Sequence, residues 1–179
     1  MNGRPTPEQI EIIGRHVKGC EVTDLGAGDL TLSRLCVRLG AKSVIAIDKE
    51  VLWNDPNSVF VAACTPEIKV YRCNFTEYRA EMDVALLVWP INHDCGLDQL
   101  VDRADVVIYL GKCTDGTMCG TPRLWYNLSC REVLDHKPDR SNTLIVYGPK
   151  RDDTRLPLLE ERAGINSDRL YTYAGDKHV

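Results

Sequence analysis

The sequence predicts an α/β protein built on one doubly wound, mostly parallel sheet of seven strands flanked by helices. Short runs rich in valine, isoleucine and leucine alternate with amphipathic stretches, which is the pattern of repeated strand–helix–strand units. Several of these runs are continuously apolar, as strands covered on both faces require. The chain length suits one domain, so residues 1–179 are expected to share a single core.

A helix is expected first, over residues 5–18. Thr6 followed by Pro7 is a helix-start signal, and Ile10 and Ile13 lie on one face of the predicted helix. The Thr6 hydroxyl suits a helix cap, and a place near a ligand is the alternative. The segment therefore reads as a lead-in helix that packs on the sheet.

The remaining elements follow from apolar periodicity and turn residues. The predicted strands are 22–25, 44–47, 68–73, 83–88, 105–110, 142–147 and 169–173. The predicted helices between them are 30–39, 97–104, 122–134 and 156–163. Residues 49–65 are poorly periodic and indicate a short helix and loop.

The most informative stretch is residues 21–50, one strand–helix–strand unit. Its first strand ends at Gly26 and Gly28, where a tight turn and close backbone approach to a ligand need no side chain. Its second strand ends in Asp48, twenty residues after Gly28. At this spacing an acidic side chain can accept hydrogen bonds from ribose hydroxyls, so the unit predicts a nucleoside site.

Two departures argue against a dinucleotide. In the fingerprint G-x-G-x-x-G the last glycine would fall on Thr31, and an acidic residue, Asp24, stands two places before the first glycine. A carboxylate beside the turn would repel a pyrophosphate, but it suits a cationic amino-acid group. An NAD-dependent oxidoreductase is therefore kept only as an alternative.

The same residues resemble the first motif of the class I S-adenosylmethionine-dependent methyltransferases, D/E-x-G-x-G-x-G. The motif appears here as Asp24, Gly26, Gly28 and Leu30, with leucine in place of the third glycine. The resemblance implies a Rossmann-like sheet of strand order 3-2-1-4-5-7-6 with an antiparallel seventh strand. It also implies S-adenosylmethionine as cofactor and methyl transfer to an N, O or S nucleophile. Many members join the last two strands by a tight hairpin, whereas the helix 156–163 is predicted here.

The resemblance also assigns cofactor contacts, mostly at strand ends. The candidate cofactor-binding residues are Asp24, Gly26, Ala27, Gly28, Asp48, Lys49, Asn74, Phe75 and Trp89. A polar residue at the third strand tip would meet the adenine amino group, and an apolar neighbour would pack on the ring. Asn74 and Phe75 fit these roles, and a strand-end turn and ordinary core packing are the alternatives.

The catalytic edge is expected where Trp89 and Pro90 end the apolar strand 83–88. His93 and Asp94 follow at once and are the candidate catalytic bases; a surface His–Asp pair is the alternative. Amino-directed nucleic-acid methyltransferases carry D/N/S-P-P-Y/F/W at this point. The present residues 88–91 lack the polar residue and the double proline, which argues against DNA adenine or cytosine-N4 methylation.

Two further features concern the substrate. Residues 111–123 are rich in glycine and threonine and follow a strand, so they are expected to form a lip over the pocket or a surface crossover. Trp89 and Trp125 could stack on a planar or cationic substrate, with core packing as the alternative. Selectivity is expected to reside in these loops or in a second subunit.

Composition restricts the environment and the partners. A net charge of −4 gives no broad attraction to phosphate backbones. No apolar run reaches the ~18 residues that span a bilayer, and the start lacks a signal-peptide core, so a cytoplasmic protein with no membrane partner is expected. The methyl acceptor is left open between a small molecule, a nucleic acid and a protein, and a homodimer is possible. A noncatalytic nucleoside-binding or accessory module is the alternative from a different class.

Eight cysteines are present, and we interpret them mainly as small buried apolar residues. The group His93, Cys95, Cys113 and Cys119 could in principle converge on zinc. Its spacing matches no common zinc module, so no metal is expected.

Overall fold

The computed structural model describes residues 4–48, 65–90, 96–112, 120–139 and 142–150. The strands are β1 (Glu21–Leu25), β2 (Ser43–Asp48), β3 (Ile68–Arg72), β4 (Met82–Val88), β5 (Ala104–Gly111), β6 (Arg131–Lys137) and β7 (Thr143–Lys150). The helices are α1 (Pro7–Val17), α2 (Thr31–Arg38), α3 (Leu97–Val101) and α4 (Pro122–Ser129). None of the helices in these ranges is long and apolar enough to cross a membrane.

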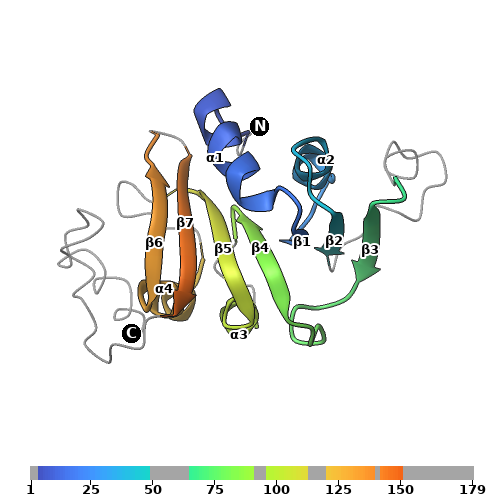
Figure 1. Cartoon of the computed structure of the whole chain (residues 1–179). Coiled ribbons are helices and arrows are strands. Elements are labelled where there is room, and N and C mark those ends of the chain that lie inside the picture. Colours follow the sequence, from blue (N-terminus) through green and yellow to red (C-terminus); the bar gives the residue numbers. More distant parts are fainter. Residues whose placement is uncertain (1–3, 49–64, 91–95, 113–119, 140–141, 151–179) are drawn as a thin grey trace, which may run out of the picture.

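The seven strands form one sheet in the order β3-β2-β1-β4-β5-β7-β6 (Figure 1). Strands β1 to β5 pair in parallel, and β7 is antiparallel to both of its neighbours. The predicted fold class is confirmed, as is the strand order that the family resemblance implied. Because β1 and β4 are neighbours in the sheet but distant in the chain, their carboxyl ends meet at the switch point where α/β sheets bind ligands.

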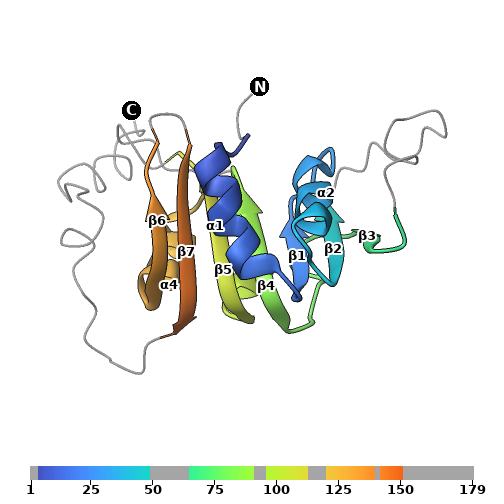
Figure 2. The ribbon, with the colours of Figure 1, turned by 45° about the horizontal axis from the view of Figure 1, so that its top comes forward.

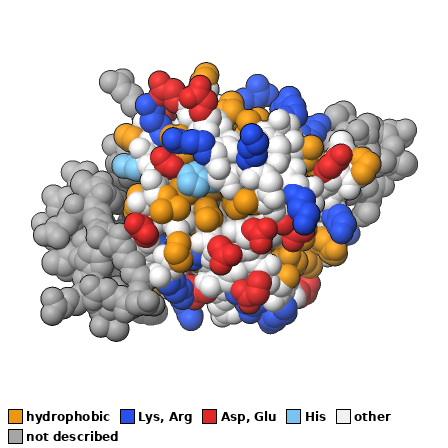
Figure 3. All heavy atoms as spheres, viewed as in Figure 1, with side chains coloured by type: hydrophobic (Ala, Val, Ile, Leu, Met, Phe, Trp, Pro, Cys, Tyr) orange, Lys and Arg blue, Asp and Glu red, His pale blue; other side chains and the backbone are white. Residues whose placement is uncertain are grey.

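Helices cover both faces of the sheet (Figures 1 and 2). Val84 and Leu86 of β4 join one apolar core with α1 and α2, whereas Ala85 and Leu87 join a second core with α3 and α4. Successive side chains of a strand point to opposite faces, so continuous apolar runs are required here. On the face seen in Figure 3, acidic and basic side chains are interspersed.

The predictions for the last strands were wrong. The helix expected over 122–134 ends at Ser129, and Arg131–Lys137 is strand β6. The run expected as sixth strand is therefore the seventh, and it pairs with β6 as a hairpin instead of following a helix. Most of β6 is half-buried or exposed, because it is an edge strand, and it lacks the apolar alternation that reveals inner strands. The predicted helix 156–163 and strand 169–173 lie outside the described residues.

Helix α1 begins where the sequence indicated. The Thr6 Oγ1 accepts a hydrogen bond from the Gln9 backbone nitrogen at 3.3 Å, and the Gln9 Oε1 accepts one from the Thr6 nitrogen at 3.0 Å, a reciprocal capping box. The helix also contacts β6, since His16 Nε2 lies 2.6 Å from Asp135 Oδ2 and Arg15 donates to Oδ1 of the same carboxylate at 3.1 Å.

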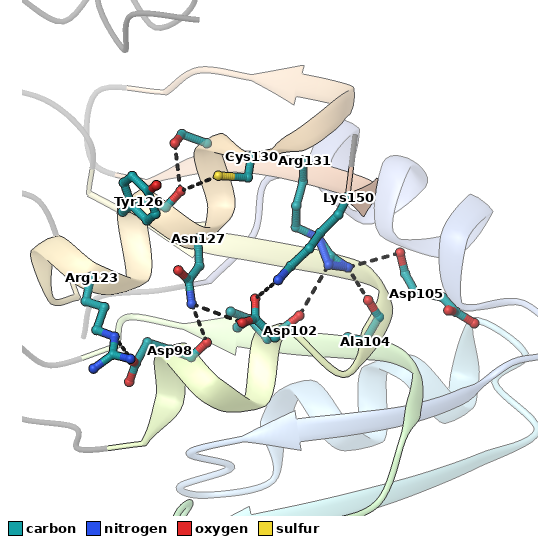
Figure 4. A network of polar contacts seen from close by, with 12 residues as sticks. Asp98, Asp102, Ala104, Asp105, Arg123, Tyr126, Asn127, Cys130, Arg131 and Lys150 are labelled. Atoms are coloured by element: carbon teal, nitrogen blue, oxygen red, sulfur yellow. Dashed lines mark hydrogen bonds and ion pairs between the residues drawn. The ribbon is translucent and has the colours of Figure 1, made fainter. Parts of the chain in front are cut away.

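A buried arginine fastens the hairpin to the rest of the sheet at the amino edge (Figure 4). The Arg131 side chain is 2% exposed and donates hydrogen bonds to backbone carbonyls. Its acceptors are Gly148 O at 2.8 Å, Val101 O at 3.2 Å, Asp105 O at 3.3 Å and Ala104 O. Two ion pairs flank it, from Lys150 to Asp102 and from Arg123 to Asp98. The Arg131 contacts lie at the opposite end of the strands from the predicted site, whereas the Arg123–Asp98 pair joins the first turns of α4 and α3.

Candidate cofactor site

The glycine turn connects β1 to α2 and packs against the carboxyl end of β2. The backbone nitrogens of Gly26 and Ala27 both donate to Ile47 O, at 2.9 and 3.1 Å, so the turn rests on the end of β2. Gly26 and Gly28 have φ angles of +83° and +48°, which L side chains rarely adopt. The Gly28 nitrogen donates to Asp48 Oδ2 at 2.9 Å, which brings together the two ends of the predicted ribose site.

Leu30, at the position of the third glycine, keeps a glycine-like backbone. Its φ and ψ are 59° and 12°, in the left-handed region, directly before α2. This conformation costs a leucine roughly 1–2 kcal/mol. Its side chain is fully buried in the core beneath α1 and α2, and such burial contributes about 1.5–3 kcal/mol. Packing therefore holds the turn in a shape that glycine would adopt without strain.

Asp24 lies beneath α2 and not on the open edge of the sheet. Its side chain is 2% exposed, and its Oδ2 accepts a hydrogen bond from Ser33 Oγ at 2.6 Å. Burial raises the pKa of Asp24 to about 6, the charges of Asp48 and Asp29 act in the same direction, and Ser33 opposes them. Within the described ranges no lysine, arginine or histidine forms an ion pair with Asp24. In the part of the chain that the structure describes, Asp24 is thus a buried carboxylate without an ion-pair partner, and it lies under the glycine turn.

The acidic character of the site extends to its rim. Asp29 follows the turn and is exposed; partial burial raises its pKa, but hydrogen bonds from Thr31 outweigh this and hold it below the usual value. Asp29, Asp24 and Asp48 thus place three carboxylates around the turn, with one cation, Arg34, beside Asp29. Such a site favours a cationic ligand over a phosphate.

Of the two residues predicted to contact adenine after β3, Phe75 lies against the glycine turn and Asn74 is exposed. Phe75 contacts the turn, since a β-carbon at Gly26 would lie 3.8 Å from Phe75 Cζ. Asn74 is exposed and closes a turn with Glu77: its backbone nitrogen and its Nδ2 donate to the Glu77 carboxylate at 3.2 and 3.4 Å. The structure thus brings Phe75, but not the Asn74 amide, against the glycine turn.

Trp89 is linked to the start of α1 and β7. Its φ is +49°, its backbone nitrogen donates to Leu110 O at 2.8 Å, and its indole Nε1 donates to Asn142 Oδ1 at 3.2 Å. Asn142 is buried. Its side-chain Nδ2 donates to Arg4 O at 3.3 Å, and its backbone carbonyl oxygen accepts from Nε2 of the buried Gln9 at 2.7 Å. The end of β4 is therefore tied to the N-terminal segment.

Replacing Asn142 by alanine is expected to lower the free energy of unfolding by about 1–3 kcal/mol. The change leaves the Trp89 indole and the Arg4 carbonyl without their buried partner, and urea unfolding at neutral pH measures the loss. Asn74→Ala, at an exposed position, is the matched control and should stay within about 0.5 kcal/mol of the parent. Equal effects of the two variants would contradict this account of Trp89.

Other predicted residues lie elsewhere. Trp125 is buried edge-to-face against Tyr109, with ring centroids 4.8 Å apart, so core packing is the reading that the structure supports. Lys49, His93, Asp94, Cys95, Cys113 and Cys119 lie outside the described residues. No group of three or more metal-ligating side chains occurs in the described part of the chain.

The interpretation of the cysteines as buried was correct for only one of the four that can be inspected. Cys36 lies on the buried face of α2, where burial and then the Asp24 charge raise the pKa of its thiol. Cys20, Cys73 and Cys130 are half-buried, and all four are free thiols.

Sequence reasoning missed Ser33 and Asn142. Ser33 shares the buried face of α2 with Cys36, and a buried hydroxyl requires a partner, so its place in that stripe was the available signal. Asn142 precedes an apolar strand and looks like an ordinary turn residue. Its partners are distant in the chain, and no local pattern indicates them.

The strand order, the single antiparallel strand and the helices on both faces define the Rossmann-like fold of class I methyltransferases. No protein-family model matches the sequence, and no curated protein matches it either. Several solved structures share this fold. One is the 1,6-didemethyltoxoflavin-N1-methyltransferase of Burkholderia thailandensis, which contains bound S-adenosylhomocysteine; the TM-score is 0.60 at 16% identity, over 79% of this chain and 76% of that one.

Two further structures have the same fold and different acceptors in their names. A proposed RNA methyltransferase from Pyrococcus horikoshii has a TM-score of 0.59 at 18% identity, over 80% of this chain and 82% of that one. The ribosomal protein L11 methylase of Lactobacillus delbrueckii subsp. bulgaricus has a TM-score of 0.56 at 17% identity, over 80% of this chain and 79% of that one. At these identities the likeness shows the fold.

Proposed function

We propose that this protein is an S-adenosylmethionine-dependent methyltransferase. The observation that carries the proposal is the buried carboxylate of Asp24 under the glycine turn, which has no ion-pair partner among the described residues, next to Asp48 at the end of β2. Together they offer a negative site for an ammonium group and an acceptor for ribose hydroxyls. The fold, which is shared with methyltransferases that act on different acceptors, supports the same cofactor class.

The described residues fit this cofactor. When bound, S-adenosylmethionine supplies a methyl group activated by its sulfonium, which an N, O or S nucleophile accepts by in-line displacement. Asp48 would accept the ribose hydroxyls, Phe75 would pack on the adenine, and the Asp24 charge would favour the cationic end. Trp89, held by Asn142, would border the acceptor side. Proximity and alignment supply most of the acceleration, and His93 or Asp94 would take the acceptor proton where a base is needed.

Binding of S-adenosylmethionine and S-adenosylhomocysteine in a calorimeter tests the proposal. We expect micromolar binding by the parent protein and roughly 10- to 100-fold weaker binding by Asp48→Ala, which loses hydrogen bonds to a charged acceptor. Asp83→Ala is the matched control: it removes an exposed strand-end carboxylate that accepts from the Glu21 nitrogen at the other edge of the sheet. Its affinity should equal that of the parent.

The outcomes separate the alternatives. Binding of neither sulfur nucleoside would overturn the proposal, and binding of NAD instead would favour an oxidoreductase. Binding without methyl transfer to any RNA, protein or small-molecule acceptor in a screen would favour the noncatalytic module. The acceptor class itself is left to that screen, because the structural relatives differ in theirs.

A further inference from the structure

One hydroxyl holds the buried carboxylate of the candidate site. Ser33, on the buried face of α2, is fully buried, and its Oγ donates to Asp24 Oδ2 at 2.6 Å. Helix α2 begins directly after the glycine turn, at Thr31, so Ser33 lies in the first turn of the helix that follows it. A hydrogen bond this short orients the buried carboxylate and favours its ionised form.

The surroundings of Asp24 otherwise oppose its charge. From β2 and from the loop after the turn, Asp48 and Asp29 repel it, and Cys36 of α2 presents a neutral thiol. Its register partners on the neighbouring strands are the apolar Ala46 and Leu86. In the ranges that the structure describes, only the side chain and backbone of Ser33 favour the ionised form.

We propose that Ser33 is a positioning residue of the cofactor site, which holds Asp24 ionised and fixed below the glycine turn and thereby sets the lowest pH at which the site binds a cationic aminoacyl nucleoside. This inference rests on the proposed function and deepens it. Ser33 itself lies on the buried face of α2, and it acts on the ligand only through Asp24.

The expected pH dependence follows from linkage. Asp24 without ligand has a pKa of about 6, so it loses its charge as the pH falls through that value. An ammonium group favours the ionised form, so affinity should fall below about pH 6. Ser33 lowers the pKa of Asp24, so its removal should move the midpoint of this fall to higher pH. A purely structural loss would weaken binding equally at every pH.

The test is titration of S-adenosylhomocysteine, which carries the same ammonium group, from pH 5.5 to 8.5. For Ser33→Ala we expect roughly tenfold weaker binding at pH 6, the equivalent of one hydrogen bond to a charged group, and near-parent binding at pH 8.5. Ser33→Thr, which keeps the hydroxyl, should restore the parent midpoint. The matched control is Ser43→Ala, because Ser43 Oγ donates to Glu21 Oε2 at 3.0 Å in the same strand–helix–strand unit but at the amino edge. It should leave the midpoint unchanged.

A double-mutant cycle of Ser33→Ala and Asp24→Asn separates the effect on Asp24 from a general loss of stability. The Asp24→Asn protein should bind weakly with no midpoint near pH 6, and adding Ser33→Ala should not change its affinity further. If Ser33→Ala does not fold, Ser33→Cys, a weaker donor of similar size, should show the same upward shift.

Two results would overturn the inference. If the parent and Ser33→Ala bind with the same midpoint near pH 6, Ser33 has no positioning role, and the proposed function still stands. If the parent does not bind at any pH, the proposed function is wrong, and the inference that rests on it is wrong too.

Discussion

The Asp24→Asn protein is expected to be more stable than its parent at pH 8 and to bind the cofactor poorly. The pKa of Asp24 is about 6 in the folded protein, against 3.8 for a solvent-exposed aspartate. At about 1.4 kcal/mol per pKa unit, ionisation of this buried group costs about 3 kcal/mol. Asparagine avoids this cost and can still accept from Ser33, but its buried NH2 group lacks a known acceptor, which costs about 1–3 kcal/mol. A net gain of up to about 2 kcal/mol is therefore expected.

The raised pKa of Asp24 determines how the stability of the folded protein changes with pH. Because the folded pKa of Asp24 is raised, the folded state binds the proton more tightly than the unfolded chain. The contribution of this group to stability is full below about pH 4 and is lost as the pH rises to about 6. The difference in unfolding free energy between Asp24→Asn and the parent should therefore grow in favour of the variant across this window, as measured by urea unfolding at several pH values.

Asp29→Asn provides a control of opposite sign. Hydrogen bonds from Thr31 hold the pKa of Asp29 below its usual value, so its charge stabilises the folded state at neutral pH. This variant should be less stable than the parent at neutral pH, and the difference should shrink as the pH falls through the folded pKa. If Asp24→Asn behaved like Asp29→Asn, the buried-charge account of the site would be wrong.

A gain in stability together with a loss of affinity is the signature of a site that tolerates strain for function. Cofactor affinity of Asp24→Asn should fall at least about tenfold at pH 8, because the negative charge under the turn is gone. Calorimetry with S-adenosylhomocysteine measures this. A stable variant with parent affinity would show that Asp24 is a structural residue.

Replacing Arg131 by methionine is expected to lower the free energy of unfolding by about 3–5 kcal/mol. The guanidinium is buried and donates to four backbone carbonyls, one at the end of α3, two in β5 and one in β7. Hydrogen bonds from a charged donor contribute about 1.5–3 kcal/mol each, and the abandoned carbonyls stay buried. Methionine fills much of the volume but offers no donor. Urea unfolding at neutral pH measures the difference.

Two further variants define what the Arg131 result means. Arg131→Lys keeps the charge but not the planar fork of donors, so an intermediate loss is expected. Arg123→Met removes an arginine whose side chain is 73% exposed and should cost less than about 1 kcal/mol. Because Arg131 lies at the amino edge, folded Arg131→Lys should bind the cofactor as the parent does. Weakened binding by a fully folded variant would contradict that separation.

The region that sequence predicted best is the unit from β1 to β2. Its two strands are near in sequence and paired in space, and its turn needs glycine at Gly26 and Gly28 for local steric reasons. Local chemistry therefore determined the positions of the turn, of α2 and of Asp48. The inner strands β4 and β5 were equally visible, because burial on both faces demands continuous apolar runs.

Strand β6 and the long-range polar contacts depend on tertiary structure, and no local sequence pattern indicates them. Strand β6 exists because β7 offers it an antiparallel partner, and its own sequence lacks the alternation of a half-buried strand. The polar contacts of Arg131 and Asn142 join segments far apart in the chain, so no spacing rule reveals them.

For the candidate site, the sequence by itself determined which residues stand at the strand ends: Asp24, the two glycines and Asp48. Only the tertiary structure decided that Asp24 turns under α2 to meet Ser33, that Leu30 holds a left-handed backbone, and that Phe75 reaches the turn. The physical reason is that residue type and spacing fix the chemistry available at a position. The charge state and orientation of a side chain depend on what buries it and on which partner donates to it.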